Sequence, residues 1–60
     1  MAYQEEKQVR IRRQIAKQAI ATAMQSNWQE SIALNKQIIG NFPNDVEAYN
    51  RLGKAYLEMG

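Results

Sequence analysis

Apolar side chains recur along the chain at helical spacing in three stretches, which are separated by short polar segments. In the first stretch, residues 3 to about 25, Ile11, Ile15 and Ala19 begin an apolar stripe that neighbouring positions widen. Neither Gly nor Pro interrupts this stretch, and its residues are good or fair helix formers. The pattern predicts one long helix whose mostly polar start, through Arg13, extends beyond the core.

The second stretch begins and ends with residues typical of helix boundaries. Asn27 is a plausible N-cap, and Glu30 stands three residues later, as in a capping box. Gly40-Asn41 supplies a stop, and Pro43 just beyond prevents continuation. Between them lie the apolar positions Trp28, Ile32, Leu34, Ile38 and Ile39. The pattern predicts a second helix.

The third stretch repeats this arrangement. Asn44 is the predicted N-cap, with Glu47 three residues later, and the helix is expected from about residue 45 to residue 58. Its apolar side contains Tyr49, Leu52, Gly53, Tyr56 and Leu57. Gly53 is expected to form a small notch that a neighbouring helix can approach. The fold class is therefore all-α, with three antiparallel helices joined by very short turns.

The segment from Tyr49 to Tyr56 reads Tyr-Asn-Arg-Leu-Gly-Lys-Ala-Tyr. It resembles the first helix of a tetratricopeptide repeat, whose signature is aromatic-x2-Leu-Gly-x2-Tyr and whose period is about 34 residues. A shift by that period places Tyr49 on Ile15 and Gly53 on Ala19, and Pro43 stands where the family has its proline. The resemblance implies an α-solenoid arrangement.

The resemblance covers about one and a half repeats. It divides the chain into a polar helical extension (residues 1–11), a first repeat (12–45) and the first helix of a second repeat (46–60). The first repeat is atypical, as terminal repeats often are, because Gln18 and Thr22 replace two family core residues and Asn35 takes a usually aromatic position. The alternative is a plain three-helix bundle that contains the motif by chance.

The composition argues against catalysis. The chain has no His and no Cys, so it cannot form a Ser-His or Cys-His nucleophile pair or a disulfide. It has no Gly-rich phosphate loop, and its carboxylates after residue 25 are dispersed, so we expect no enzyme activity, metal or cofactor. No apolar run approaches the roughly 18 residues that a membrane span needs. The N-terminus also resembles no targeting signal, which favours a cytoplasmic protein.

In the tetratricopeptide family, the first helix of each repeat lines a concave groove that grips a peptide or a partner's helix. Carried over by position, the groove would contain Arg13, Ala16, Lys17 and Ile20 from the first helix and Glu47, Asn50, Arg51 and Lys54 from the third. These cations and the amide suit acidic segments or a terminal carboxylate. The alternative is that they are merely solvated surface charges.

The basic residues are concentrated in the first part of the chain. Residues 1–24 carry five Lys or Arg against two Glu, a net charge of +3, whereas residues 25–60 carry a net charge of −1. Arg10, Arg13 and Lys17 share one helix face that could follow nucleic-acid phosphates. However, Glu5 and Glu6 are near, and no aromatic residues are interleaved for base stacking. A solvated helix end is therefore favoured over nucleic-acid binding, and binding to a membrane surface is favoured still less.

A repeat array also leaves an apolar face for the next helix to cover. Here that face would be Tyr49, Leu52, Tyr56 and Leu57. The chain is then either a fragment of a longer array or an element that associates with itself, most simply as a homodimer. Self-assembly without a separate ligand is thus the main alternative to a peptide-binding module.

Overall fold

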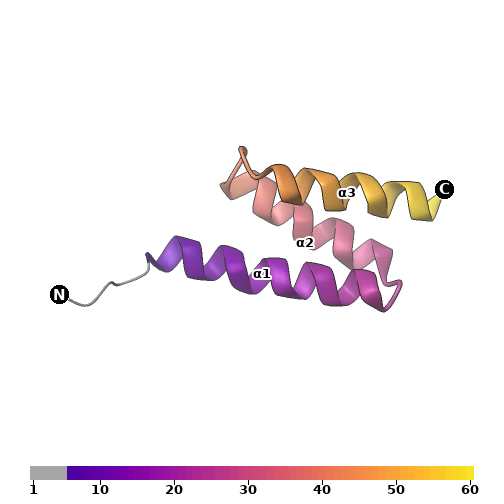
Figure 1. The fold of residues 1–60 in the computed structure, drawn as a ribbon, viewed down its shortest axis with the longest axis horizontal. Helices are drawn as coiled ribbons and strands as arrows, with labels where there is room; N and C mark the ends of the chain where they lie inside the picture. Colours follow the sequence, from indigo (N-terminus) through magenta and orange to yellow (C-terminus); the bar gives the residue numbers. More distant parts are fainter. Residues whose placement is uncertain (1–5) are drawn as a thin grey trace.

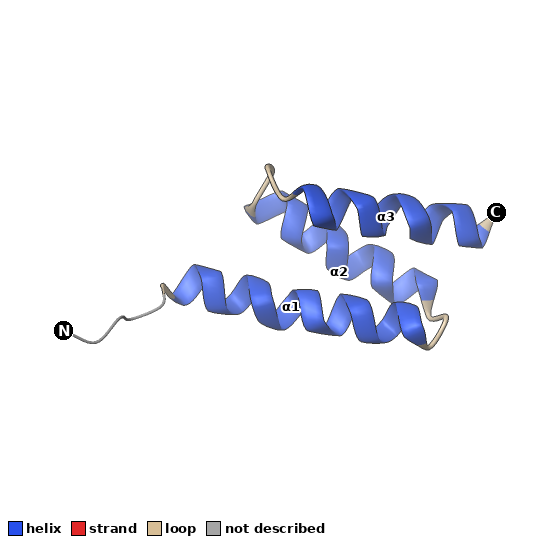
Figure 2. Ribbon diagram, viewed as in Figure 1, coloured by secondary structure: helices blue, strands red, loops and turns tan. Residues whose placement is uncertain are grey.

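The computed structural model describes residues 6–60, which fold into three α-helices (Figures 1 and 2). They are α1 (Lys7–Met24), α2 (Trp28–Asn41) and α3 (Val46–Met59). Within this described part the chain forms no strand, so the predicted all-α class is confirmed. The predicted start of the first helix at residue 3 lies outside the described residues, as does Glu5.

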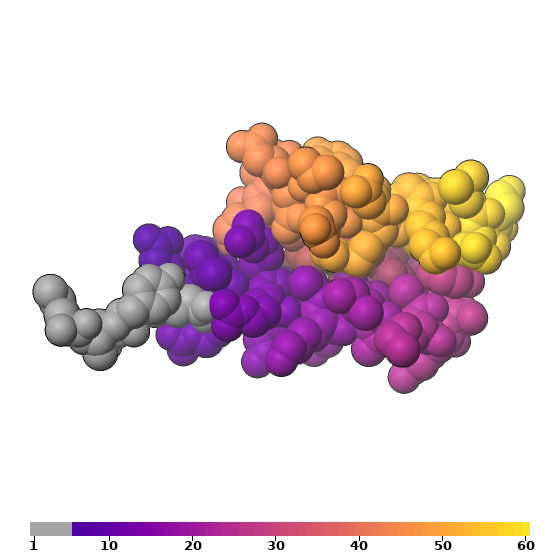
Figure 3. All heavy atoms as spheres, viewed as in Figure 1, coloured from indigo at the N-terminus to yellow at the C-terminus, as the bar shows by residue number. Residues whose placement is uncertain are grey.

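The central element of the fold is α2, which packs against both of the other helices. It runs antiparallel to each of them, so α1 and α3 point in the same direction (Figure 1). Direct contact between α1 and α3 is slight. In the space-filling view the two helices lie side by side and leave a seam along the visible face of the molecule (Figure 3).

Small residues dominate the contact between the helices. Ala19, Ala48 and Ala55 are completely buried, as is Ile38 in the middle of α2. Their small side chains allow the helix backbones to approach closely. The predicted notch at Gly53 is wrong within this chain, because Gly53 is exposed and nothing lies within 4 Å of the place where its Cβ would be. The face of α3 that carries Ala48 and Ala55 meets α2 instead.

The boundaries of α2 and α3 correct two predicted signals. Gly40 does not stop α2, since the helix continues through Asn41, and the N–H of Phe42 donates to the carbonyl of Ile38 at 2.7 Å. The N-cap of α3 is Asp45 and not Asn44: the Asp45 Oδ1 accepts a hydrogen bond from the Ala48 N–H at 3.1 Å. Both residues are good caps, and only the backbone path after the proline decides between them.

The turn between α1 and α2 depends on the backbone. Ser26 has a positive φ of 59°, and its N–H donates to the carbonyl of Ala23 at 2.9 Å. The Asn27 N–H donates to the carbonyl of Thr22 at 2.8 Å. These two bonds form a Schellman motif, which satisfies the last carbonyls of α1. Asn27 is the N-cap of α2, as predicted, but its side chain makes no capping hydrogen bond.

Candidate functional site

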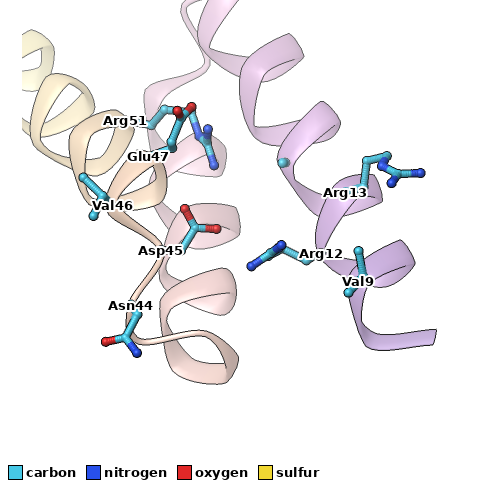
Figure 4. Close-up of a pocket in the computed structure, with 9 residues that line it drawn as sticks. Val9, Arg12, Arg13, Asn44, Asp45, Val46, Glu47 and Arg51 are labelled. Carbon is cyan, nitrogen blue, oxygen red and sulfur yellow. The ribbon is translucent and has the colours of Figure 1, made fainter. Parts of the chain in front are cut away.

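Two adjoining hollows lie between α1 and α3. The first, here called the polar hollow, has a volume of about 530 Å³. It is lined by Val9, Arg12, Arg13, Ala16, Asn44, Asp45, Val46, Glu47 and Arg51 (Figure 4). The second, here called the apolar hollow, has a volume of about 320 Å³ and is lined by Ile20, Ala23, Met24, Trp28, Arg51 and Lys54. Arg51 lines both hollows, so the two adjoin along α1 and α3, and together they are here called the groove.

Most of the predicted groove residues come together here. The polar hollow contains Arg13, Ala16, Glu47 and Arg51, and the apolar hollow contains Ile20, Arg51 and Lys54. Lys17 and Asn50 are exposed and line neither hollow. At 3.6 residues per turn, Lys17 lies at the outer edge of the face of α1 that lines the hollows, which explains its absence.

Sequence reasoning missed several lining residues. Arg12 and Val9 were assigned to the polar start of the first helix, yet both line the polar hollow. Trp28 and Met24 line the apolar hollow, and neither was among the predicted groove residues. Val9, Arg12, Ala16 and Ala23 follow one another at spacings of three, four and seven residues. That spacing was the available signal that they share a face with Arg13 and Ile20.

Charges in the polar hollow are mixed, with a cationic excess. Three arginines, Arg12, Arg13 and Arg51, face two acids, Asp45 and Glu47. Arg12 and Asp45 point towards each other across the opening, whereas Arg13 points outward (Figure 4). The Arg12 guanidinium carbon lies 4.8 Å from the ring centroid of Phe42, a cation–π contact that holds α1 against the end of α2. The Asp45 carboxylate is already engaged as the cap of α3.

Below the groove, a buried polar network joins all three helices. The Asn35 side chain is completely buried, and its Nδ2 donates to the Ser31 carbonyl at 2.9 Å and to the Ser31 Oγ at 3.4 Å. The Ser31 Oγ donates to the carbonyl of Ala19 in α1 at 3.2 Å. The Asn35 Oδ1 accepts from the Arg51 Nε in α3 at 2.9 Å. Within residues 6–60, every buried side-chain polar atom has a partner, as burial away from water requires.

This network fixes the guanidinium of Arg51. Its side chain is half-buried, and its Nε–H is used by Asn35. A guanidinium has five N–H donors, so four remain on the two terminal Nη groups. Those groups can bind a carboxylate with two parallel hydrogen bonds. Arg51 thus joins the core to the groove in a defined orientation.

The predicted self-association face of α3 is partly exposed. Leu57 is 83% exposed, Tyr49 is 49% exposed and Tyr56 is 48% exposed, whereas Leu52 is half-buried towards the other helices. Val46 is 67% exposed and was missed by the prediction. The positions of Val46, Tyr49, Tyr56 and Leu57 follow helical spacing, so they form one stripe, here called the apolar stripe of α3.

Residues 6–60 contain neither a metal-binding cluster nor a membrane-spanning helix. No three His, Cys, Asp or Glu side chains gather there in a way that could hold a metal ion. None of the three described helices is long and apolar enough to cross a bilayer. The groove and the apolar stripe of α3 are therefore the two features of this described part from which a function can be argued.

No family model matches the chain, and neither a curated protein nor a solved structure is significantly similar to it. The resemblance to tetratricopeptide repeats therefore rests on the residues and their spacing alone. What the groove binds has to be inferred from its own side chains.

Proposed function

We propose that this chain is a cytoplasmic protein-interaction module of tetratricopeptide-repeat type, which binds an acidic peptide segment or partner helix in the groove between α1 and α3. The observation that carries the proposal is the position of the groove. The resemblance assigns the ligand to one face of the first and third helices, and both hollows lie on that face. The parallel course of α1 and α3 with α2 behind them is also how successive repeats of an α-solenoid present their first helices (Figure 1).

The charges of the groove favour an acidic ligand. Arg51 and Lys54 line the apolar hollow, whose lining residues include no acid, although Glu47 lies near Arg51 on the side of the polar hollow (Figure 4). In the polar hollow the arginines outnumber the acids. Carboxylates bind arginine with charge-assisted hydrogen bonds, which are about twice as strong as neutral ones. An acidic segment with some apolar side chains would match both hollows.

The test uses a fluorescein-labelled peptide of repeating Leu-Glu-Ser units with both ends blocked, and fluorescence anisotropy as the measurement. We expect Lys54→Glu to weaken binding about tenfold or more, because it replaces an attractive charge with a repulsive one in the groove. Lys36→Glu is the matched control, since Lys36 lines neither hollow and its ammonium lies 5.8 Å from the Tyr56 ring centroid. Equal losses from both variants would mean that net charge alone attracts the peptide, and absence of binding would reject the proposal.

A single-stranded DNA dodecamer serves as the counter-probe in the same measurement. It tests whether nucleic acid binds to the basic face of α1, which carries Arg10, Arg13 and Lys17. We expect the DNA to bind more weakly than the peptide at physiological salt, because Trp28 alone among the residues that line the groove is aromatic and gives bases little to stack on. Stronger binding of DNA would favour the nucleic-acid alternative.

A second candidate function is self-assembly through α3. The observation that favours it is the apolar stripe of α3, in which Leu57 is 83% exposed. Contiguous exposed apolar patches mark interaction sites, whereas single exposed apolar residues are normal. A homodimer would bury this stripe without any separate ligand.

A further inference from the structure

Arg51 stands where the two hollows adjoin, and its surroundings indicate what kind of ligand the groove accepts. We propose that Arg51 and the apolar hollow form one subsite for an acidic residue that neighbours a bulky apolar residue. In this subsite, Asn35 is the positioning residue that fixes the guanidinium. The inference rests on the proposed function and specifies the ligand of the same groove.

The orientation of the Asn35 amide is fixed by its hydrogen bonds. Its Nδ2 donates to both the carbonyl and the Oγ of Ser31, so its Oδ1 points in the opposite direction, towards α3. A flipped amide would lose these bonds and leave a buried donor facing Arg51. An apolar residue could fill the same space without needing any partner. The buried amide therefore serves to present one acceptor to the Arg51 Nε.

The hydrogen bond to Asn35 restricts the side chain of Arg51. A free arginine side chain samples many rotamers, and a ligand that binds it must restrict them. Here the hydrogen bond of 2.9 Å from Nε to Asn35 restricts them in the folded chain, before any ligand arrives. The terminal Nη groups are then pre-oriented for a carboxylate. Pre-orientation of this kind raises affinity without adding a contact to the ligand.

The hollow beside Arg51 is lined mostly by apolar side chains. Four apolar residues line the adjacent hollow: Ile20, Ala23, Met24 and Trp28. Its volume of about 320 Å³ is sufficient for one bulky aliphatic or aromatic side chain. Lys54 adds a second cation at the same place. A carboxylate on Arg51 and an apolar side chain in this hollow would come from neighbouring residues of one ligand.

The carboxylate is assigned to an Asp or Glu side chain inside a peptide and not to a peptide end. The groove continues past Arg51 into the polar hollow, which is lined by three arginines and two acids. A continuing chain can use this second hollow, whereas a chain that ended at Arg51 would leave it empty. The occupant is therefore an extended or helical peptide that passes Arg51.

Three end-blocked peptides test the ligand class by fluorescence anisotropy: the Leu-Glu-Ser repeat, the same peptide with Ser in place of Leu, and the same with Gln in place of Glu. We expect each altered peptide to bind about tenfold more weakly, since one lacks the apolar side chain and the other lacks the carboxylate. A fourth peptide, with a single Leu-Glu unit and a free C-terminus, tests the source of the carboxylate. If only that peptide binds, the assignment to a side-chain carboxylate is wrong.

The positioning role is tested with Asn35→Leu, which keeps the shape of the side chain and removes its hydrogen bonds. We expect the helicity to persist and the unfolding midpoint to fall, because the Arg51 Nε–H loses its partner, while affinity for the Leu-Glu-Ser peptide falls about three- to tenfold. In an Arg51→Ala background, the same change should have no further effect on affinity. A merely structural role would weaken binding in both backgrounds, and that result would overturn the inference.

Arg51→Lys keeps the test valid should Asn35→Leu fail to fold. Lysine retains the charge but lacks the Nε–H that Asn35 holds and the paired Nη groups. We expect a similar loss of affinity, and unchanged affinity would overturn the inference. Equal binding of the Leu and Ser peptides would reject the subsite while leaving the proposed function intact. Failure of every acidic peptide to bind would reject the proposed function itself.

Discussion

Ser31 and Asn35 occupy the inner face of α2, next to Ile38. Each of them bonds to a different neighbour, Ser31 to Ala19 in α1 and Asn35 to Arg51 in α3. A buried polar group left without its partner costs about 1–3 kcal/mol, so an arrangement of the helices that broke these bonds would be disfavoured. Two polar side chains thereby help to specify how both outer helices are placed against α2, which a core of small alanines alone would specify poorly.

A second feature at the scale of a single residue is the strained turn after α1. Ser26 has a φ of 59°, a left-handed conformation that costs an L-residue about 1–2 kcal/mol and that glycine adopts freely. We expect Ser26→Gly to raise the free energy of unfolding by about 0.5–1 kcal/mol, because part of the gain is lost to the greater freedom of unfolded glycine. Urea denaturation followed by circular dichroism measures this change.

Ser26→Ala is the control for that measurement. Alanine keeps the Cβ that makes the left-handed conformation unfavourable, so this variant should be no more stable than the unsubstituted chain. If Ala stabilises the chain as much as Gly does, the gain comes from elsewhere and the account of the turn is wrong.

At the scale of the elements, the sequence predicted the number, order and approximate bounds of the helices. Their existence was predictable because each apolar stripe continues over several turns and the separating segments are short. Individual residues that mark helix ends predicted the exact bounds less well. Gly40 lies inside α2, and the cap of α3 moved from Asn44 to the adjacent Asp45. A sequence cannot distinguish two neighbouring capping residues when the preceding turn decides which of them reaches the first free N–H groups.

The N-cap of α3 can be tested by comparing substitutions of Asp45 and of its neighbour Asn44. Asp45→Ala removes the hydrogen bond to the Ala48 N–H and a favourable charge at the helix N-terminus. We expect it to lower the free energy of unfolding by about 1 kcal/mol. The same denaturation experiment on Asn44→Ala should show a change within about 0.5 kcal/mol, as for an ordinary exposed position. A larger loss from Asn44→Ala than from Asp45→Ala would contradict the observed cap.

At the scale of the whole molecule, the helix faces that form the groove could be predicted. The hydrogen bond from Arg51 to Asn35, which fixes Arg51 in the groove, could not. Of the groove residues to which the 34-residue resemblance pointed, Lys17 and Asn50 line neither hollow. The others line the two hollows, among them Arg13, Ile20, Arg51 and Lys54. The bond between Asn35 and Arg51 joins residues 16 positions apart on different helices. Such a pair depends on the packing angle of the helices. The only sequence signal was a polar residue, Asn35, in line with the apolar face of the second helix.

Packing is sparse for a chain of 60 residues. Within the described part, the apolar side chains that are fully buried are three alanines and Ile38. Small domains bury a limited fraction of their surface and are often stabilised by association. The residues of the apolar stripe of α3 are about half or more exposed, so a second copy could cover them. Its removal from water would add about 25 cal/mol for each Å² of apolar surface buried.

Self-association through that stripe is tested by sedimentation equilibrium over a wide range of concentrations, with circular dichroism on the same samples. We expect a dimer for the unsubstituted chain and a monomer for Leu57→Asp, because this change places a charge in the apolar interface. Gln29→Asp alters the charge equally at an exposed position of α2 and should leave the dimer intact. Lys54→Glu should do the same, since Lys54 faces the groove. A Leu57→Asp chain of unchanged mass would exclude the stripe as the interface, and peptide binding would then be the function that α1 and α3 support.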